Sequence, residues 1–127
     1  MGAGRLQSIT NVANAQLSAD TALARDILSE SQYANGQSSV GLARMEYGNA
    51  LEKMVAQNIA DSPIDRMFFK YVGGKSNPDF VGRNLLSGMN FDITTPGQVA
   101  IHLTREGYGL NLNVVTYLRP PNFWTFP

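Results

Sequence analysis

The 127-residue chain contains no cysteine and only one histidine, His102. The lack of cysteine excludes disulfides and thiolate metal sites, and a single histidine excludes zinc sites that need several imidazole ligands. A bound metal ion would therefore be held by oxygen atoms. No run of about 18 apolar residues is present, so we expect no membrane span. The beginning of the chain also lacks the basic and apolar regions of a signal peptide.

The chain carries no excess of either charge, with ten Lys or Arg and ten Asp or Glu residues. Zero formal net charge argues against a general polyanion-binding protein. The two halves differ, however, because residues 1–64 hold four basic and six acidic residues, whereas residues 65–127 hold six and four. The second half is therefore expected to present a modest positive field, sufficient for a few phosphates. A surface of mixed charge without a polyanionic partner is the alternative.

The length and a hydrophobic content of 43% are typical of one compact fold with a core. Apolar residues from Leu6 to Leu17 recur at helical spacing, and a second helical stretch is predicted after Ser18 as its N-cap, ending at Asn35-Gly36. We treat residues 1–37 as an accessory helical segment and residues 38–127 as the main unit. The main unit begins with the strongest predicted helix, from Ser38 or Ser39 to Ala60.

After this helix the apolar pattern changes to a period of two, which predicts strands. The expected elements are strands over 67–72, 80–81 and 89–94, a helix over 97–105 that starts behind Thr95-Pro96, and a last strand over 110–118. Residues 38–127 therefore read helix, three strands, helix, strand. The predicted fold class is α/β (α+β), with an αβββαβ order.

Two acidic residues stand out in the strand region. Between Met89 and Thr94 the apolar residues alternate with polar ones, which places Asp92 at the centre of a polar strand face. Asp79 follows Pro78 immediately before the preceding strand. A carboxylate in mid-strand is unusual for a face that is merely solvated, so the pair predicts a metal or phosphate-ester site. As alternatives, Asp79 forms a turn and Asp92 pairs with a buried arginine.

These residues resemble the PD-(D/E)xK signature of the restriction-endonuclease-like superfamily. Pro78-Asp79 matches its first element, and Asp92-Ile93-Thr94 matches the second except that Thr94 stands in place of lysine. The resemblance implies an αβββαβ core with a mixed sheet, and an Mg²⁺ ion held by Asp79 and Asp92 for phosphodiester hydrolysis.

The resemblance also implies roles for residues outside the two aspartates. The superfamily often carries an acid on its first core helix after a glycine, and Gly48 with Glu52 resembles that element, Glu46 being the weaker candidate. Lys70 or Lys75 is a candidate to replace the missing lysine, and Arg83 is a further candidate for substrate binding. Glu52 could equally be a solvated helix residue.

His102 supports two interpretations. It is either a partly buried histidine bonded to the backbone or, on an RNA substrate, a general base acting on a ribose 2′-hydroxyl. The second role would give a cyclic phosphate without a metal ion and would account for the absent lysine.

Residues 40–127 resemble, more narrowly, the C-terminal nuclease domains of bacterial polymorphic toxins of the contact-dependent growth inhibition and Rhs types. The resemblance rests on the segments Gly73–Phe80, Gly88–Thr95 and Leu112–Tyr117. It implies delivery from the cell surface or by secretion as part of a larger toxin, and action in the cytoplasm of the target cell. It also implies a cognate immunity protein and a tRNA substrate, in some cases presented by elongation factor Tu.

The near-zero net charge favours such presentation, because a weak field gives little affinity for free nucleic acid. Two alternatives remain open. One is an Mg²⁺-dependent DNase toxin of the same fold. The other is a non-catalytic binding module in which Thr94 reflects lost activity.

Overall fold

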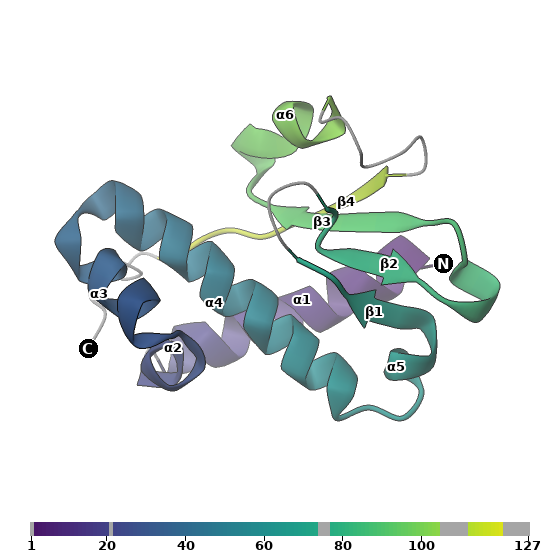
Figure 1. Ribbon diagram of the computed structural model, residues 1–127, viewed down its shortest axis with the longest axis horizontal. Coiled ribbons are helices and arrows are strands. Elements are labelled where there is room, and N and C mark those ends of the chain that lie inside the picture. Colours follow the sequence, from purple (N-terminus) through teal and green to yellow (C-terminus); the bar gives the residue numbers. More distant parts are fainter. Residues whose placement is uncertain (1, 21, 74–76, 105–111, 121–127) are drawn as a thin grey trace.

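The computed structural model describes residues 2–20, 22–73, 77–104 and 112–120, which form helices packed on a four-stranded sheet (Figure 1). In chain order the elements are α1 (Gly2–Ala19), α2 (Ala22–Ile27), α3 (Glu30–Ser38), α4 (Val40–Ala60), α5 (Asp65–Phe68), β1 (Phe69–Tyr71), β2 (Phe80–Gly82), η1 (Asn84–Leu86), β3 (Asn90–Thr94), η2 (Pro96–Gln98), α6 (Val99–Leu103) and β4 (Leu112–Thr116). The mixed class is confirmed, and α4, β1, β2, β3, α6 and β4 follow one another in the expected order. Among the described helices, none is long and apolar enough to cross a membrane.

The sheet is mixed, with strand order β1-β2-β3-β4. The first three strands form an antiparallel meander, and β4 runs parallel to β3, with Asp92 opposite Val114. Parallel neighbours cannot be joined by a tight turn, so the chain crosses over through η2 and α6. As a result α6 packs against β4 and follows directly on the end of β3.

The long helix α4 forms as the sequence predicts. Its N-cap is Ser39, whose hydroxyl accepts a hydrogen bond from the Leu42 N–H at 3.1 Å. Figure 1 shows α4 running diagonally through the molecule, with α2 and α3 at one end and the sheet toward the other. Helix α4 therefore contacts both the accessory helices and the sheet.

The prediction for residues 18–37 is wrong in two respects. Ser18 does not cap a helix, because its hydroxyl donates to the Asn14 carbonyl within α1, and Asp20 accepts from the Ala22 N–H instead. The single predicted stretch is two helices. Ser29 and Gln32 form a capping box that begins α3, and α3 continues through Gly36 until Ser39 ends it. These caps outweigh the local tendency of Asn-Gly to end a helix.

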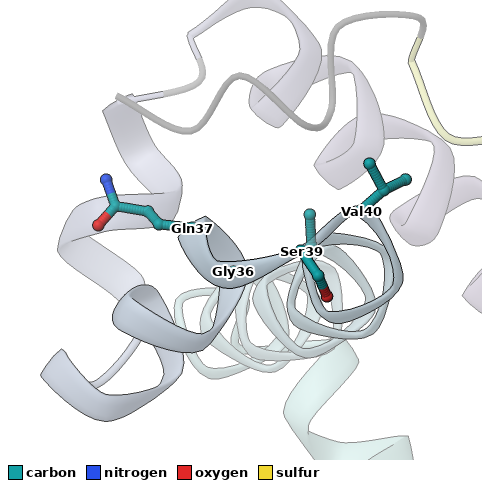
Figure 2. A pocket seen from close by; sticks show the side chains of 5 residues that line it. Gly36, Gln37, Ser39 and Val40 are labelled. Atoms are coloured by element: carbon teal, nitrogen blue, oxygen red, sulfur yellow. The ribbon is translucent and has the colours of Figure 1, made fainter.

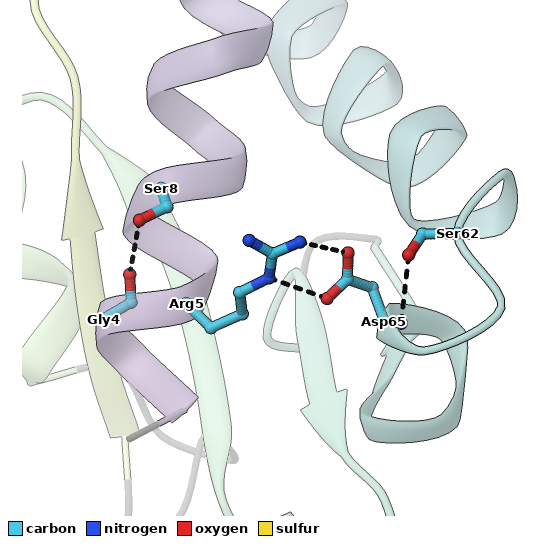
Figure 3. A network of polar contacts seen from close by, with 5 residues as sticks. All are labelled: Gly4, Arg5, Ser8, Ser62 and Asp65. Atoms are coloured by element: carbon cyan, nitrogen blue, oxygen red, sulfur yellow. Dashed lines mark hydrogen bonds and ion pairs between the residues drawn. The ribbon is translucent and has the colours of Figure 1, made fainter.

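The first strand is shorter than predicted, because residues 65–68 form α5 instead of extended chain. Arg5 of α1 donates two hydrogen bonds to the Asp65 carboxylate, at 2.8 and 2.7 Å, and the Ser62 hydroxyl accepts from the Asp65 N–H at 3.3 Å (Figure 3). The carboxylate side chain is 7% exposed. This contact joins residues 60 positions apart, so no local pattern in the sequence could reveal it.

A single hydrophobic core joins the accessory segment to the main unit. Side chains that are no more than 1% exposed come from α1, α4 and the sheet, and include Leu6, Ala13, Leu17, Leu51, Val55, Phe80 and Phe91. Residues 1–37 therefore share their core with residues 38–127.

Helix α1 also covers the outer edge of β4. The Gln7 side chain accepts from the Thr116 N–H at 3.3 Å and donates to the Thr116 carbonyl at 2.8 Å. Asn14 donates to the Leu118 carbonyl at 2.9 Å. An exposed strand edge invites pairing with another chain, and these amides occupy it instead.

One glycine is required by a close approach of the backbone. A Cβ atom at Gly82, the last residue of β2, would lie 1.9 Å from the Leu86 carbonyl oxygen. The main chain of η1 therefore closes directly over the end of β2, and no other residue type fits there.

Candidate active site

Asp79 and Asp92 meet where β2 and β3 separate. Main-chain pairing between these strands ends at Phe80, opposite Phe91. Beyond that point the Asp79 N–H donates to Oδ1 of Asp92 at 3.0 Å, and the Ile93 N–H donates to Oδ2 of Asp79 at 2.8 Å. The two carboxylates thus replace main-chain carbonyls as acceptors, which holds both side chains between the strands.

The partner of Asp92 is His102 on α6, not an arginine. Nδ1 of His102 contacts Oδ2 of Asp92, and the two side chains are 15% and 1% exposed respectively. A carboxylate only accepts hydrogen bonds, so Nδ1 is the donor in this contact, and Nε2 is the ring nitrogen that Asp92 does not contact. The chain crossover that makes β4 parallel to β3 brings His102 to this position.

Glu52 of α4 completes the acidic cluster from the helical side. Its side chain shares a hydrogen bond with Asp79 and another with the Tyr71 hydroxyl. Burial, together with the charges of Glu52 and Asp92, raises the pKa of Asp79 to about 9, and burial also raises the pKa of Glu52. The pair therefore holds a proton near neutral pH. Burial and the Glu52 charge raise the pKa of Tyr71 as well.

Of these residues, Glu52, Tyr71, Asp79 and His102 line a cleft of about 900 Å³ between α4, the ends of β1 and β3, and α6. Its other lining residues are mostly polar and come from α3, α4, β3, η2 with its N-cap, and the chain after β4: Gln32, Gly41, Arg44, Met45, Gly48, Asn49, Ile93, Thr94, Thr95, Gln98, Tyr117 and Arg119. Two arginines among them supply positive charge beside the acidic cluster. The cleft therefore brings together a histidine, two acids with raised pKa values and two arginines.

The remaining predicted site residues are placed differently. Thr94 lines the cleft and is 6% exposed. Lys70 on β1 and Arg83 do not line it, and the Arg83 guanidinium donates to the Arg66 carbonyl at 3.3 Å. Lys75 lies outside the described residues. Glu46, the weaker acid candidate, is 1% exposed and accepts from the Asn49 side chain.

Tyr71, Tyr117 and Asn49 also line the cleft, although no sequence pattern marks them as site residues. Tyr71 and Tyr117 carried the apolar signal of strand residues, which hides the role of their hydroxyl groups. A Cβ atom at Gly48 would lie 3.0 Å from the Tyr117 hydroxyl, so this glycine lets the phenol approach α4. Burial raises the pKa of Tyr117 to about 12, and the phenol stays neutral. In the sequence, only the four-residue spacing of Gly48 and Glu52 indicated that this face of α4 belongs to the site.

The predicted Mg²⁺ ion would be held by Asp79 and Asp92, whose oxygens already have protein partners. Three of the four oxygens of Asp79 and Asp92 accept hydrogen bonds from protein groups or contact His102, and Asp79 also bonds Glu52. Within the described ranges, no group of three or more His, Cys, Asp or Glu side chains is arranged to hold a metal ion. Most oxygens of the two aspartates are occupied by protein groups. We therefore assign no reaction step to Mg²⁺, whose binding remains a prediction.

Two smaller cavities lie away from the cleft. One, of about 410 Å³, lies at the junction of α3 and α4 and is lined by Gly36, Gln37, Ser39, Val40 and Ala43 (Figure 2). The other, of about 350 Å³, lies between α1 and the end of α4 beside the Arg5–Asp65 ion pair. Neither is lined by a histidine, and Asp65 in the second is paired with Arg5, so the cleft is the candidate active site.

Comparisons with protein-family models, with curated proteins and with solved structures found no match to this chain.

Proposed function

We propose that this protein is an endoribonuclease that cleaves RNA by transesterification, with His102 as the general base. The observation that carries the proposal is the contact of His102, which lines the cleft, with the buried Asp92 carboxylate. A carboxylate that holds Nδ1 orients the imidazole and stabilises its protonated form, as in other histidine–aspartate pairs. The protonated Glu52–Asp79 pair lies beside it and supplies an acid.

The first half of the reaction uses the base. Nε2 of His102 takes the proton from a ribose 2′-hydroxyl, and the 2′-oxygen forms a bond to the adjacent phosphorus. The imidazolium that results is stabilised by Asp92, to which it is already bonded. Because His102 and Asp92 are held before substrate arrives, little reorganisation is needed at the moment of transfer.

The second half uses the acid pair. The bond between phosphorus and the 5′-oxygen breaks, and that oxygen takes the proton shared by Glu52 and Asp79. The products are a 2′,3′-cyclic phosphate end and a 5′-hydroxyl end. A carboxylic acid with a raised pKa is suited to this role because it remains protonated near neutral pH. Arg44 and Arg119 line the same cleft and can offset the phosphate charge.

The mechanism requires a 2′-hydroxyl, which favours RNA over the DNase alternative. Thr94 in place of the superfamily lysine is consistent with it, since no metal-bound hydroxide has to be stabilised. tRNA is the proposed substrate class, and the zero formal net charge favours tRNA presented by another protein, such as elongation factor Tu.

The wider context is proposed from resemblance alone. A restriction-endonuclease-like core is supported by the element order α4, β1, β2, β3, α6, β4. It is also supported by the contact of Asp79, just before β2, with Asp92 on β3. We infer an antibacterial toxin domain delivered as part of a larger protein, active in the target-cell cytoplasm and blocked by an immunity protein. Expression without an inhibitor should then arrest growth in the wild type and not in His102→Ala.

Digestion of total tRNA and of plasmid DNA by the purified protein tests the activity. We expect cleavage of tRNA with cyclic phosphate ends, no cleavage of plasmid, and resistance of an oligonucleotide that carries one 2′-deoxyribose at the cut site. His102→Ala should lower the rate by about 10²–10⁴-fold, the range for loss of a general base. Gln57→Ala, on the exposed face of α4, is the control. Cleavage of plasmid, or a fully active His102→Ala protein, would overturn the proposal.

A further inference from the structure

One turn of α4 before Glu52 carries a polar group that the reaction above does not use. Met45, Gly48, Asn49 and Glu52 all line the cleft, with Met45 four residues before Asn49 and Glu52 three residues after it, so they share one helix face. Asn49 is half-buried and lies on the same helix face as Glu52, three residues before it. It is placed to contact a nucleotide next to the bond that is cleaved.

The Asn49 amide has one defined orientation. Its Nδ2 donates to Oε1 of Glu46 at 2.6 Å, and Glu46 is 1% exposed. A carboxylate only accepts hydrogen bonds, so the amino end of the amide must face Glu46. The carbonyl oxygen Oδ1 is therefore the end that Asn49 can offer to a ligand. Glu46 thus acts through Asn49 as a positioning residue.

We propose that Asn49, oriented by Glu46, reads the base beside the scissile phosphate and selects adenine or cytosine. These two bases carry an amine at the position where guanine and uracil carry a carbonyl oxygen. An amine donates to Oδ1, whereas a carbonyl oxygen would face another acceptor and leave both groups without a donor. Met45 is 51% exposed and borders Asn49 with apolar surface for the ring of the base.

The inference rests on the proposed ribonuclease activity, and cleavage of an RNA with a randomised loop tests it. Sequencing of the 5′-hydroxyl ends should show adenine or cytosine favoured by about two- to tenfold at one fixed position, the ratio that a single hydrogen bond supplies. Asn49→Ala should abolish this preference. Asn58→Ala, on the same helix and bonded to Gln16, is the matched control and should keep it.

Glu46→Gln tests whether the orientation of the Asn49 amide matters, because the amide itself is still present in this variant. A glutamine amide can donate to Oδ1 of Asn49, which allows the Asn49 amide to turn its amino end to the cleft. The preference should then weaken or reverse toward guanine and uracil. Thermal unfolding shows whether the Glu46→Gln protein is folded. If this protein does not fold, Asn49→Ala alone tests the inference. An unchanged preference in either folded variant would overturn the inference.

A binding measurement distinguishes this inference from the activity itself. His102→Ala protein titrated with fluorescent oligo-A, oligo-C, oligo-G and oligo-U should bind the first two more tightly. Equal affinity for all four overturns base selection even if the wild type cleaves RNA. Selective binding without any cleavage would instead refute the ribonuclease proposal and leave base recognition standing.

Discussion

The main-chain N–H of Asp79 donates to the side chain of Asp92, and the N–H of Ile93, next to Asp92, donates to the side chain of Asp79. This reciprocal pairing joins β2 to β3 where their main-chain ladder ends. It also leaves both carboxylates surrounded by protein donors. The acids are therefore part of the sheet as well as part of the site, and their substitution affects both.

Asp92→Asn tests the orientation of His102. The asparagine carbonyl can still accept from the Asp79 N–H, so the strand pairing is retained. Its amino group facing Nδ1 favours the ring tautomer with the proton on Nε2, and the base is lost. We expect kcat to fall by about 10²–10⁴-fold in a tRNA cleavage assay. An unchanged kcat in a variant of unchanged thermal stability would contradict the role of Asp92.

The stability of the protein should fall as pH rises from 4 toward 9. The folded-state pKa of Asp79 is about 9 and lies above the ordinary value of 3.8, so in this range the folded state binds a proton that the unfolded state has released. The free energy of unfolding therefore declines until pH passes the folded-state pKa. Urea unfolding at pH 5, 7 and 9 measures this slope.

Asp79→Asn is the control for the pH dependence, because an amide does not titrate. The slope between pH 5 and 9 should become much smaller in this variant. A wild-type protein that gains stability over the same range would show that Asp79 is ionised in the fold.

Removal of divalent ions should leave the activity unchanged. His102 and the Glu52–Asp79 pair supply base and acid without a cation, so cleavage of tRNA in excess EDTA should match cleavage in Mg²⁺. The measurement is the initial rate in both buffers, with total tRNA refolded beforehand to keep the substrate constant. Activity that is lost in EDTA and returns with Mg²⁺ would favour the metal mechanism expected from the superfamily resemblance.

Gly82→Ala should destabilise the fold strongly. The new methyl group would lie 1.9 Å from the Leu86 carbonyl oxygen, which is backbone and cannot turn aside. We expect a loss of about 3 kcal/mol or more in the free energy of unfolding. Gly97→Ala is the matched control, since nothing lies within 4 Å of its Cβ position. Equal stability of the two variants would refute the close approach of η1 to β2.

Arg5→Ala should lower stability by about 1–3 kcal/mol, because it leaves the buried Asp65 carboxylate without its main partner. Arg5 also holds the pKa of Asp65 below its ordinary value of 3.8, so this contribution is present at neutral pH and is lost as pH falls through the folded-state pKa. A double-mutant cycle with Asp65→Asn isolates the pair. Additive effects would show that it contributes nothing to α5.

The features that the sequence predicted well are those with a strong local pattern. Helix α4 has a serine cap and a long apolar stripe, and β3 has a complete alternation around Asp92. The regions that it predicted poorly depend on caps or distant contacts. Ser29 divides the second helical stretch, and the ion pair of Arg5 with Asp65 turns the start of the first strand into α5.

The sequence by itself determined the kinds of chemistry available, namely two strand aspartates, a helix glutamate and a single histidine, with no cysteine. The tertiary structure alone decided how they pair. Asp92 bonds His102 because the crossover after β3 brings α6 beside it, and Asp79 shares a proton with Glu52 because α4 packs against the sheet. Side-chain period and capping act over a few residues, whereas these contacts depend on how whole elements pack.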